Sequence, residues 1–178
     1  RFQLKTFQGV RYSLFHYNAN GAPGGYADFD RIVIDEPRAR GLLTPIPYKK
    51  AITLSDTNSG QVLVVKDGAV NTVPASHPLA SSAAARFLVV NRGQGRVALQ
   101  TPSGFLSATG TEIGLRAGKP AEAETFQWIE TISGELTLLS LTTHRYLSIY
   151  SERGLITVDH PGPQRNRKDS CRLQWRIA

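Results

Sequence analysis

The stretch GRVALQTPSGFLSA, residues 95–108, decides the fold of this 178-residue chain. Two short, mainly apolar runs, 97–99 and 105–107, lie on either side of a polar turn that contains Pro102 and Gly104. Short apolar runs bounded by turn-forming residues are typical of β-strands and not of helices. The stretch therefore predicts two short strands joined by a turn.

The same arrangement occurs three times between residues 48 and 178. Opening strands are predicted at 52–54, 97–99 and 136–138, second strands at 62–64, 105–107 and 146–148, third strands at 69–71, 113–115 and 155–157, and fourth strands at 86–89, 125–128 and 172–175. A unit of roughly 40 residues cannot bury its apolar face alone, so the three copies must share one core. Three units of four strands predict an all-β chain with a β-trefoil, since a propeller needs four or more blades. One helical turn is expected at 79–85.

The residues before this repeat are organised differently. Alternating apolar residues within 1–36 predict a few antiparallel strands that end a β-sandwich domain, and residues 37–47 contain three prolines and predict an extended linker. Three strands alone form a marginal sheet, so this segment needs support from the rest of the chain or from a part outside it. Because the chain starts at Arg1 and shows no signal region, we expect a processed or excised piece.

Composition narrows the range of partners. The net charge is +7, but the basic residues are scattered and only five of them gather near the C-terminus, without interleaved aromatic residues. A solvated basic surface is therefore favoured over a footprint for nucleic acid or acidic glycans. No apolar run approaches the roughly 18 residues of a membrane helix, so no membrane contact is expected. The single cysteine, Cys171, excludes an internal disulfide and is interpreted as a small buried hydrophobe.

The trefoil segment, residues 48–178, resembles the fascin-like trefoils. The resemblance rests on residues 95–99, GRVAL, residues 104–108, GFLSA, and the matching residues 145–148, RYLS. These motifs are mainly structural, because their apolar residues belong to the core and their glycines to turns.

The first segment resembles the end of the β-sandwich that follows the catalytic propeller in some family 43 glycoside hydrolases. The residues that carry this resemblance are 12–17, YSLFHY, 24–30, GGYADFD, and 35–41, DEPRARG. It implies a secreted or periplasmic bacterial parent of β-xylosidase or α-L-arabinofuranosidase type, acting on xylan or arabinan. The partners it implies are a plant polysaccharide or oligosaccharide and the propeller and sandwich of the parent. The propeller is absent from this sequence, so no catalytic residue is assigned.

Candidate binding residues follow from loop position and hydrogen-bonding capacity. A sugar site is expected in the loops after the second strands, with the candidates His144, Arg145 and Tyr150 in the third unit and Gln100, Ser103 and Thr109 in the second. Asp28 and Asp30 share one strand face and are weak candidates for calcium, although two carboxylates are too few for a site. A solvated face, or pairing with Arg11 or Arg31, is the alternative. No other cofactor is indicated.

Two further groups are interpreted as structural. Glu122, Glu124 and Glu130 are expected to be exposed charges on a loop and strand edge, and not the carboxylate pair of a glycosidase. Trp128 and Trp175 occupy matching places in two units and are expected in the core. They directly follow Gln127 and Gln174, so the Gln-x-Trp motif of ricin-type lectins is absent.

The leading hypothesis is therefore a non-catalytic accessory module that binds carbohydrate for a parent hydrolase. Two alternatives remain open at this point. The trefoil could be purely architectural and brace the parent enzyme, or it could bind a protein partner as the fascins do.

Overall fold

The computed structural model describes residues 21, 28, 29, 44–131, 133–164 and 169–178. The predicted sandwich strands within 1–36 and most of the predicted linker lie outside these ranges, so that division of the chain stays a prediction. At the linker end that is described, Pro47 is buried and Ile46 packs against the core. No helix in the described ranges is long and apolar enough to cross a membrane.

The described residues form twelve strands and three short 3-10 helices. The strands are β1 (Ala51–Asp56), β2 (Val62–Lys66), β3 (Ala69–Val73), β4 (Phe87–Gly93), β5 (Arg96–Thr101), β6 (Gly104–Thr109), β7 (Glu112–Arg116), β8 (Phe126–Glu130), β9 (Leu136–Ser140), β10 (Tyr146–Tyr150), β11 (Leu155–His160) and β12 (Leu173–Ile177). The helices are η1 (Pro78–Ser81), η2 (Ala83–Ala85) and η3 (Ser151–Arg153). All twelve predicted strands are confirmed, although the fourth strand of each unit starts one residue later than expected. The helical turn predicted at 79–85 is present as η1 and η2.

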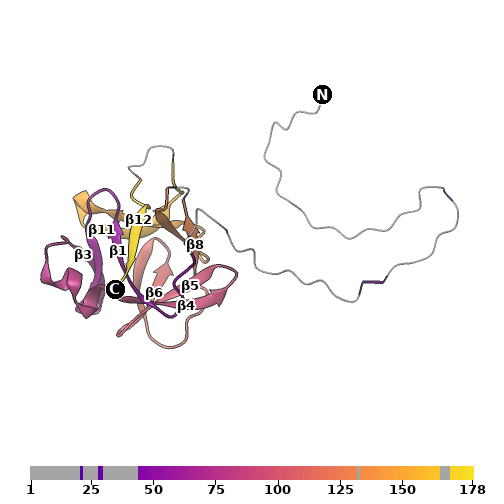
Figure 1. Cartoon of the computed structure of the whole chain (residues 1–178), viewed down its shortest axis with the longest axis horizontal. Coiled ribbons are helices and arrows are strands. Elements are labelled where there is room, and N and C mark those ends of the chain that lie inside the picture. The colour runs from indigo at the N-terminus through magenta and orange to yellow at the C-terminus, as the bar shows by residue number, and fades with distance from the viewer. Residues whose placement is uncertain (1–20, 22–27, 30–43, 132, 165–168) are drawn as a thin grey trace, which may run out of the picture. The chain divides into compact units, whose positions relative to one another are not determined.

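The first and fourth strands of the three units close into a six-stranded ring. Antiparallel pairs run in the order β1–β4, β4–β5, β5–β8, β8–β9, β9–β12 and β12–β1. The second and third strands of each unit form the hairpins β2–β3, β6–β7 and β10–β11. A closed ring of first and fourth strands with three hairpins is a β-trefoil, and its closure leaves the ring without an unpaired edge (Figure 1). The predicted fold class is confirmed.

One hydrophobic core lies inside the trefoil, and all three units supply equivalent residues to it. Fully buried side chains come from the opening strands (Ile52, Leu54, Val97, Leu99, Leu136 and Leu138), the second strands (Leu63, Leu106 and Leu147) and the fourth strands (Phe87, Phe126 and Leu173). Because alternate residues of a strand face opposite sides, the period-two spacing of these residues places them together. The apolar pattern thus gives the three units their shared core.

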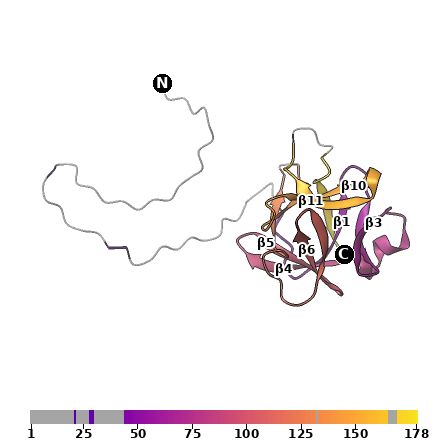
Figure 2. The ribbon, with the colours of Figure 1, turned by 180° about the vertical axis from the view of Figure 1, so that it is seen from behind.

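The turn between the first and second strands differs among the units. In units one and three it is long, and Gly60 and His144 occupy the same left-handed position, with φ of 68° and 54°. In both turns the amide of this residue donates to the carbonyl of the last residue of the opening strand. Unit two has a shorter turn that needs Gly104, since a Cβ there would lie 2.6 Å from the Arg116 carbonyl oxygen. Figure 2 shows the ribbon from behind.

Candidate functional site

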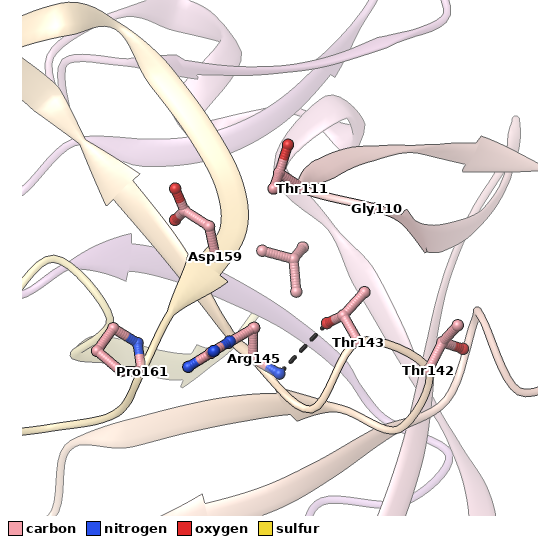
Figure 3. A pocket seen from close by; sticks show the side chains of 8 residues that line it. Gly110, Thr111, Thr142, Thr143, Arg145, Asp159 and Pro161 are labelled. Atoms are coloured by element: carbon pink, nitrogen blue, oxygen red, sulfur yellow. Dashed lines mark hydrogen bonds between the residues drawn. The ribbon is translucent and has the colours of Figure 1, made fainter.

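An open hollow lies where the second and third units of the trefoil meet (Figure 3). Its volume is about 660 Å³. The β6–β7 turn, the β9–β10 turn, β11 and the residues just after β11 supply its walls, and the lining residues are Gly110, Thr111, Thr142, Thr143, Arg145, Val158, Asp159 and Pro161. The two units are joined beside the hollow, because Thr157 pairs with Glu112 and the amide of Val158 donates to the Thr111 carbonyl at 2.8 Å. The walls are therefore held by strand pairing.

Asp159 owes its position in this hollow to a β-bulge. In the β10–β11 hairpin Leu147 pairs with Val158 and Tyr146 pairs with His160, so Asp159 has no partner residue on β10. The equivalent hairpins β2–β3 and β6–β7 pair without such a shift. Bulges redirect a side chain and occur often beside functional sites. The third unit thus differs from the other two at the residue that lines the hollow.

Two hydroxyl groups orient the Asp159 carboxylate. Thr157 Oγ1 donates to Asp159 Oδ1 at 2.5 Å, and the hydroxyl of Tyr150 donates to the same oxygen at 3.4 Å. The side chain itself is exposed. Oδ2 has no hydrogen-bond partner among the described residues and is available as an acceptor.

Arg145 provides the positive charge of the hollow. Its amide donates to Thr143 Oγ1 at 3.3 Å, which orders the turn, and its exposed side chain extends towards Pro161 (Figure 3). The guanidinium makes no ion pair within the described residues, including with Asp159. The hollow therefore carries an anionic and a cationic group that do not neutralise each other directly.

The structure brings together only part of the predicted sugar site. Arg145 lines the hollow, Tyr150 contacts it through Asp159, and His144 lies in the adjoining turn with an exposed side chain. Thr109 ends β6 next to the lining residue Gly110. Gln100 on β5 pairs with Leu88 and Phe105, and Ser103 is exposed in the β5–β6 turn, so neither lines the hollow.

Sequence reasoning missed Asp159, Thr111 and Thr143. Thr111 comes from unit two and the other two residues from unit three, and the pairing of β11 with β7 brings the two units together here. The sequence carries no local signal for Asp159, because the bulge that positions it follows from the pairing of β11 with β10.

The expectation that Glu124 is exposed is wrong. Its side chain is 1% exposed, and its carboxylate accepts hydrogen bonds from Ser107 Oγ at 2.6 Å and from the Ala121 amide at 2.8 Å. Burial raises the pKa of Glu124, but the hydrogen bonds from Ser107 and Ala121 and the charge of Arg116, 3.6 Å away, outweigh it and hold the pKa below its ordinary value. Glu124 is thus a structural acceptor, while Glu122 is exposed as expected.

The interpretation of the two tryptophans as core residues is confirmed for Trp128 and holds in part for Trp175. Trp128 is buried, Trp175 is half-buried, and their rings meet edge to face with centroids 5.4 Å apart. Both indole N–H groups donate to Glu130 Oε1, at 3.4 and 3.1 Å. Glu130 Oε2 accepts a hydrogen bond from the Thr44 amide at 3.0 Å. Glu130 is therefore half-buried and bonded to three segments, and not a free strand-edge charge.

The other candidate groups have structural roles or lie outside the described residues. Arg172, from the predicted basic cluster, is buried and contacts Glu135 at 2.9 Å and Asp169 at 3.4 Å. Cys171 is buried, and burial raises the pKa of its thiol to about 11, as fits a small hydrophobe. Asp28 is exposed, whereas Asp30 lies outside the described residues. Within the described ranges, no group of three or more His, Cys, Asp or Glu residues could hold a metal ion.

Comparison with known proteins supports the fold. No protein-family model matches the chain, and no curated protein matches its sequence. Among solved structures, the chain is similar to a GlcNAcα1-4Gal-releasing endo-β-galactosidase from Clostridium perfringens, with a TM-score of 0.60, 14% identity, and coverage of 72% of this chain and 32% of that one. It is also similar to ThreeFoil, a designed threefold-symmetric protein, with a TM-score of 0.59, 12% identity, and coverage of 72% of this chain and 98% of that one.

At these identities the likeness concerns the fold alone. The chain spans about a third of the endo-β-galactosidase, so nothing of that enzyme's activity is carried over here. These comparisons give no support to the resemblance to family 43 hydrolases, which stays a prediction.

Proposed function

We propose that this chain is a non-catalytic carbohydrate-binding module and that the hollow between units two and three is its binding site. The observation that carries the proposal is the bulge at Asp159, found in only one of the three described hairpins. A purely structural hairpin does not need this bulge, since the hairpins of units one and two pair without one.

The chemistry of the hollow suits a sugar. Asp159 Oδ2 can accept hydrogen bonds from sugar hydroxyls, and the hydroxyls of Thr111, Thr142 and Thr143 can both donate and accept. The exposed Pro161 offers apolar surface to the C–H face of a ring. A concave site with a few fixed polar groups is the usual form of a small-molecule site.

The finer assignment rests on sequence resemblance. We propose a secreted or periplasmic bacterial parent of the family 43 type, with arabinose- or xylose-containing plant polysaccharide as the ligand. The likeness of the trefoil to part of an endo-β-galactosidase supports the association of this fold with a glycoside hydrolase.

Calorimetric titration with xylan- and arabinan-derived oligosaccharides tests the proposal. We expect saturable heat, and we expect Asp159→Asn to weaken the affinity at least about tenfold, because the amide keeps the Oδ1 acceptor but replaces the unpartnered Oδ2 acceptor by a donor. Asp67→Asn, in the exposed β2–β3 turn, is the matched control and should leave the affinity unchanged. Hydrolysis of a nitrophenyl xyloside or arabinoside by this chain would contradict its non-catalytic assignment.

An architectural role is the second candidate, and one observation favours it. The Thr44 amide is bonded to Glu130, and Ile46 and Pro47 pack onto the trefoil, so the chain entering the trefoil is anchored to it. No heat with any oligosaccharide, from a chain shown to be folded, would overturn the binding proposal in favour of this role.

A further inference from the structure

We infer that the ligand of the hollow is an acidic oligosaccharide that presents a uronic-acid carboxylate to Arg145 and hydroxyl groups to Asp159. The inference rests on the proposed function and specifies its ligand class. It comes from the two opposite charges that line the hollow.

The first step is that Arg145 has no carboxylate partner among the residues that the structure describes. Two other arginines of the trefoil have carboxylate partners: Arg172 is paired with Glu135 and Asp169, and Arg116 with Glu124. Arg145 lines the same hollow as Asp159 and still makes no ion pair with it. A guanidinium presents parallel N–H donors that match a carboxylate, so Arg145 is suited to an anion supplied by the ligand.

The second step is that Asp159 selects against a simple anion. Asp159 lines the same hollow, with one carboxylate oxygen held by Thr157 and Tyr150 and the other without a hydrogen-bond partner among the described residues. Sulfate would bring a negative charge close to this group without any O–H to donate to its acceptor-only carboxylate, so the repulsion would not be offset. A uronic acid satisfies both sides, because its hydroxyls donate to Asp159 while its carboxylate accepts from Arg145.

The third step is the charge of the whole chain. The net charge of +7 raises the local concentration of polyanions, and an acidic polysaccharide benefits from this attraction. Arg145 is exposed, so its contribution must weaken as salt increases. Salt dependence is therefore a second readout.

The test compares three xylo-oligosaccharides of equal backbone length by calorimetry. One carries a glucuronic acid branch, the second carries the same branch with its carboxyl reduced to an alcohol, and the third is unbranched. We expect the acidic sugar to bind at least about tenfold more tightly than its reduced form, since a charged hydrogen bond is lost on reduction. The difference should shrink between low and high salt.

Two variants assign the effect to the hollow. Arg145→Gln should make the affinities for the acidic and reduced sugars equal. Arg86→Gln removes the same charge from an exposed arginine that does not line the hollow, and it should keep the preference. Equal binding of the acidic and reduced sugars to the unmodified chain would overturn the uronate inference and leave sugar binding intact. If the chain binds none of the three xylo-oligosaccharides and no arabinan fragment, both the uronate inference and the proposed carbohydrate binding are overturned.

Discussion

At the scale of single residues, two neighbouring buried positions, one on the second strand and one just before the fourth strand, show how each unit accommodates polar groups. The pair is Val64 with Ala85 in unit one, Ser107 with Glu124 in unit two, and Ser148 with Cys171 in unit three. The equivalence follows from the strand alignment and from matching backbone hydrogen bonds. The Ala108 amide donates to the Ala123 carbonyl, and the Ile149 amide donates to the Ser170 carbonyl, both at 2.8 Å. Among the described residues, only unit two forms a hydrogen bond between the two side chains, and the buried Ser148 hydroxyl has no partner.

This difference predicts that replacing the serine by alanine has different effects on the free energy of unfolding in units two and three. Ser107→Ala removes a donor from the buried Glu124 and should lower the free energy of unfolding by roughly 1–3 kcal/mol. Ser148→Ala removes an unsatisfied hydroxyl and should leave that free energy unchanged or raise it by up to about 1 kcal/mol. Urea unfolding followed by circular dichroism measures both. Equal losses of unfolding free energy in the two variants would contradict the different roles assigned to the two hydroxyl groups.

Glu124 also predicts a pH dependence of stability. Its pKa is lower in the folded chain than the ordinary value of 4.5, so the unfolded chain binds the proton more tightly. The contribution of Glu124 to the free energy of unfolding is therefore complete above about pH 4.5 and is lost as the pH falls through the pKa of the folded chain. Urea midpoints measured between pH 7 and pH 3 should fall less steeply for Glu124→Gln than for the unmodified chain. Glu122→Gln, at an exposed position, should retain the original slope.

At the scale of elements, Glu130 joins β8, β12 and the chain that enters the trefoil. Its carboxylate accepts hydrogen bonds from both indoles and from the Thr44 amide. Glu130→Ala should therefore lower the free energy of unfolding by roughly 1–3 kcal/mol. Glu122→Ala, the exposed control, should change it by less than about 0.5 kcal/mol. Tryptophan fluorescence during urea unfolding reports the change, and equal behaviour of the two variants would show that the three bonds do not stabilise the fold.

The elements also show where sequence reasoning succeeds and where it ends. Short apolar runs such as 97–99 locate all twelve strands, because period-two burial is local information. Glu124 was misplaced because its burial depends on Ser107, which reaches it from another strand. Asp159 was missed because a bulge is a property of register, visible only once Leu147 and Tyr146 have found their partners. Arg145 was predicted from its loop position next to a strand, and the structure places it on the lining of the hollow.

At the scale of the whole molecule, the closed ring makes the trefoil depend on its last strand. β12 pairs with both β1 and β9, so it joins the first unit to the third. The hydrophobic core, by contrast, draws on no described residue before Ile46. These two facts predict opposite effects of shortening the chain at its two ends.

A chain of residues 44–178 should fold alone and unfold in one cooperative transition, because its ring and its core are complete. A chain of residues 1–171 should not fold, since it lacks β12 and leaves β1 and β9 unpaired on one side. Thermal unfolding followed by circular dichroism distinguishes them: the first should show a sigmoidal transition and the second none. Loss of the transition on removal of residues 1–43 would mean that the first segment completes the trefoil. Retention of the transition, together with sugar binding, would place both the fold and the site within residues 44–178.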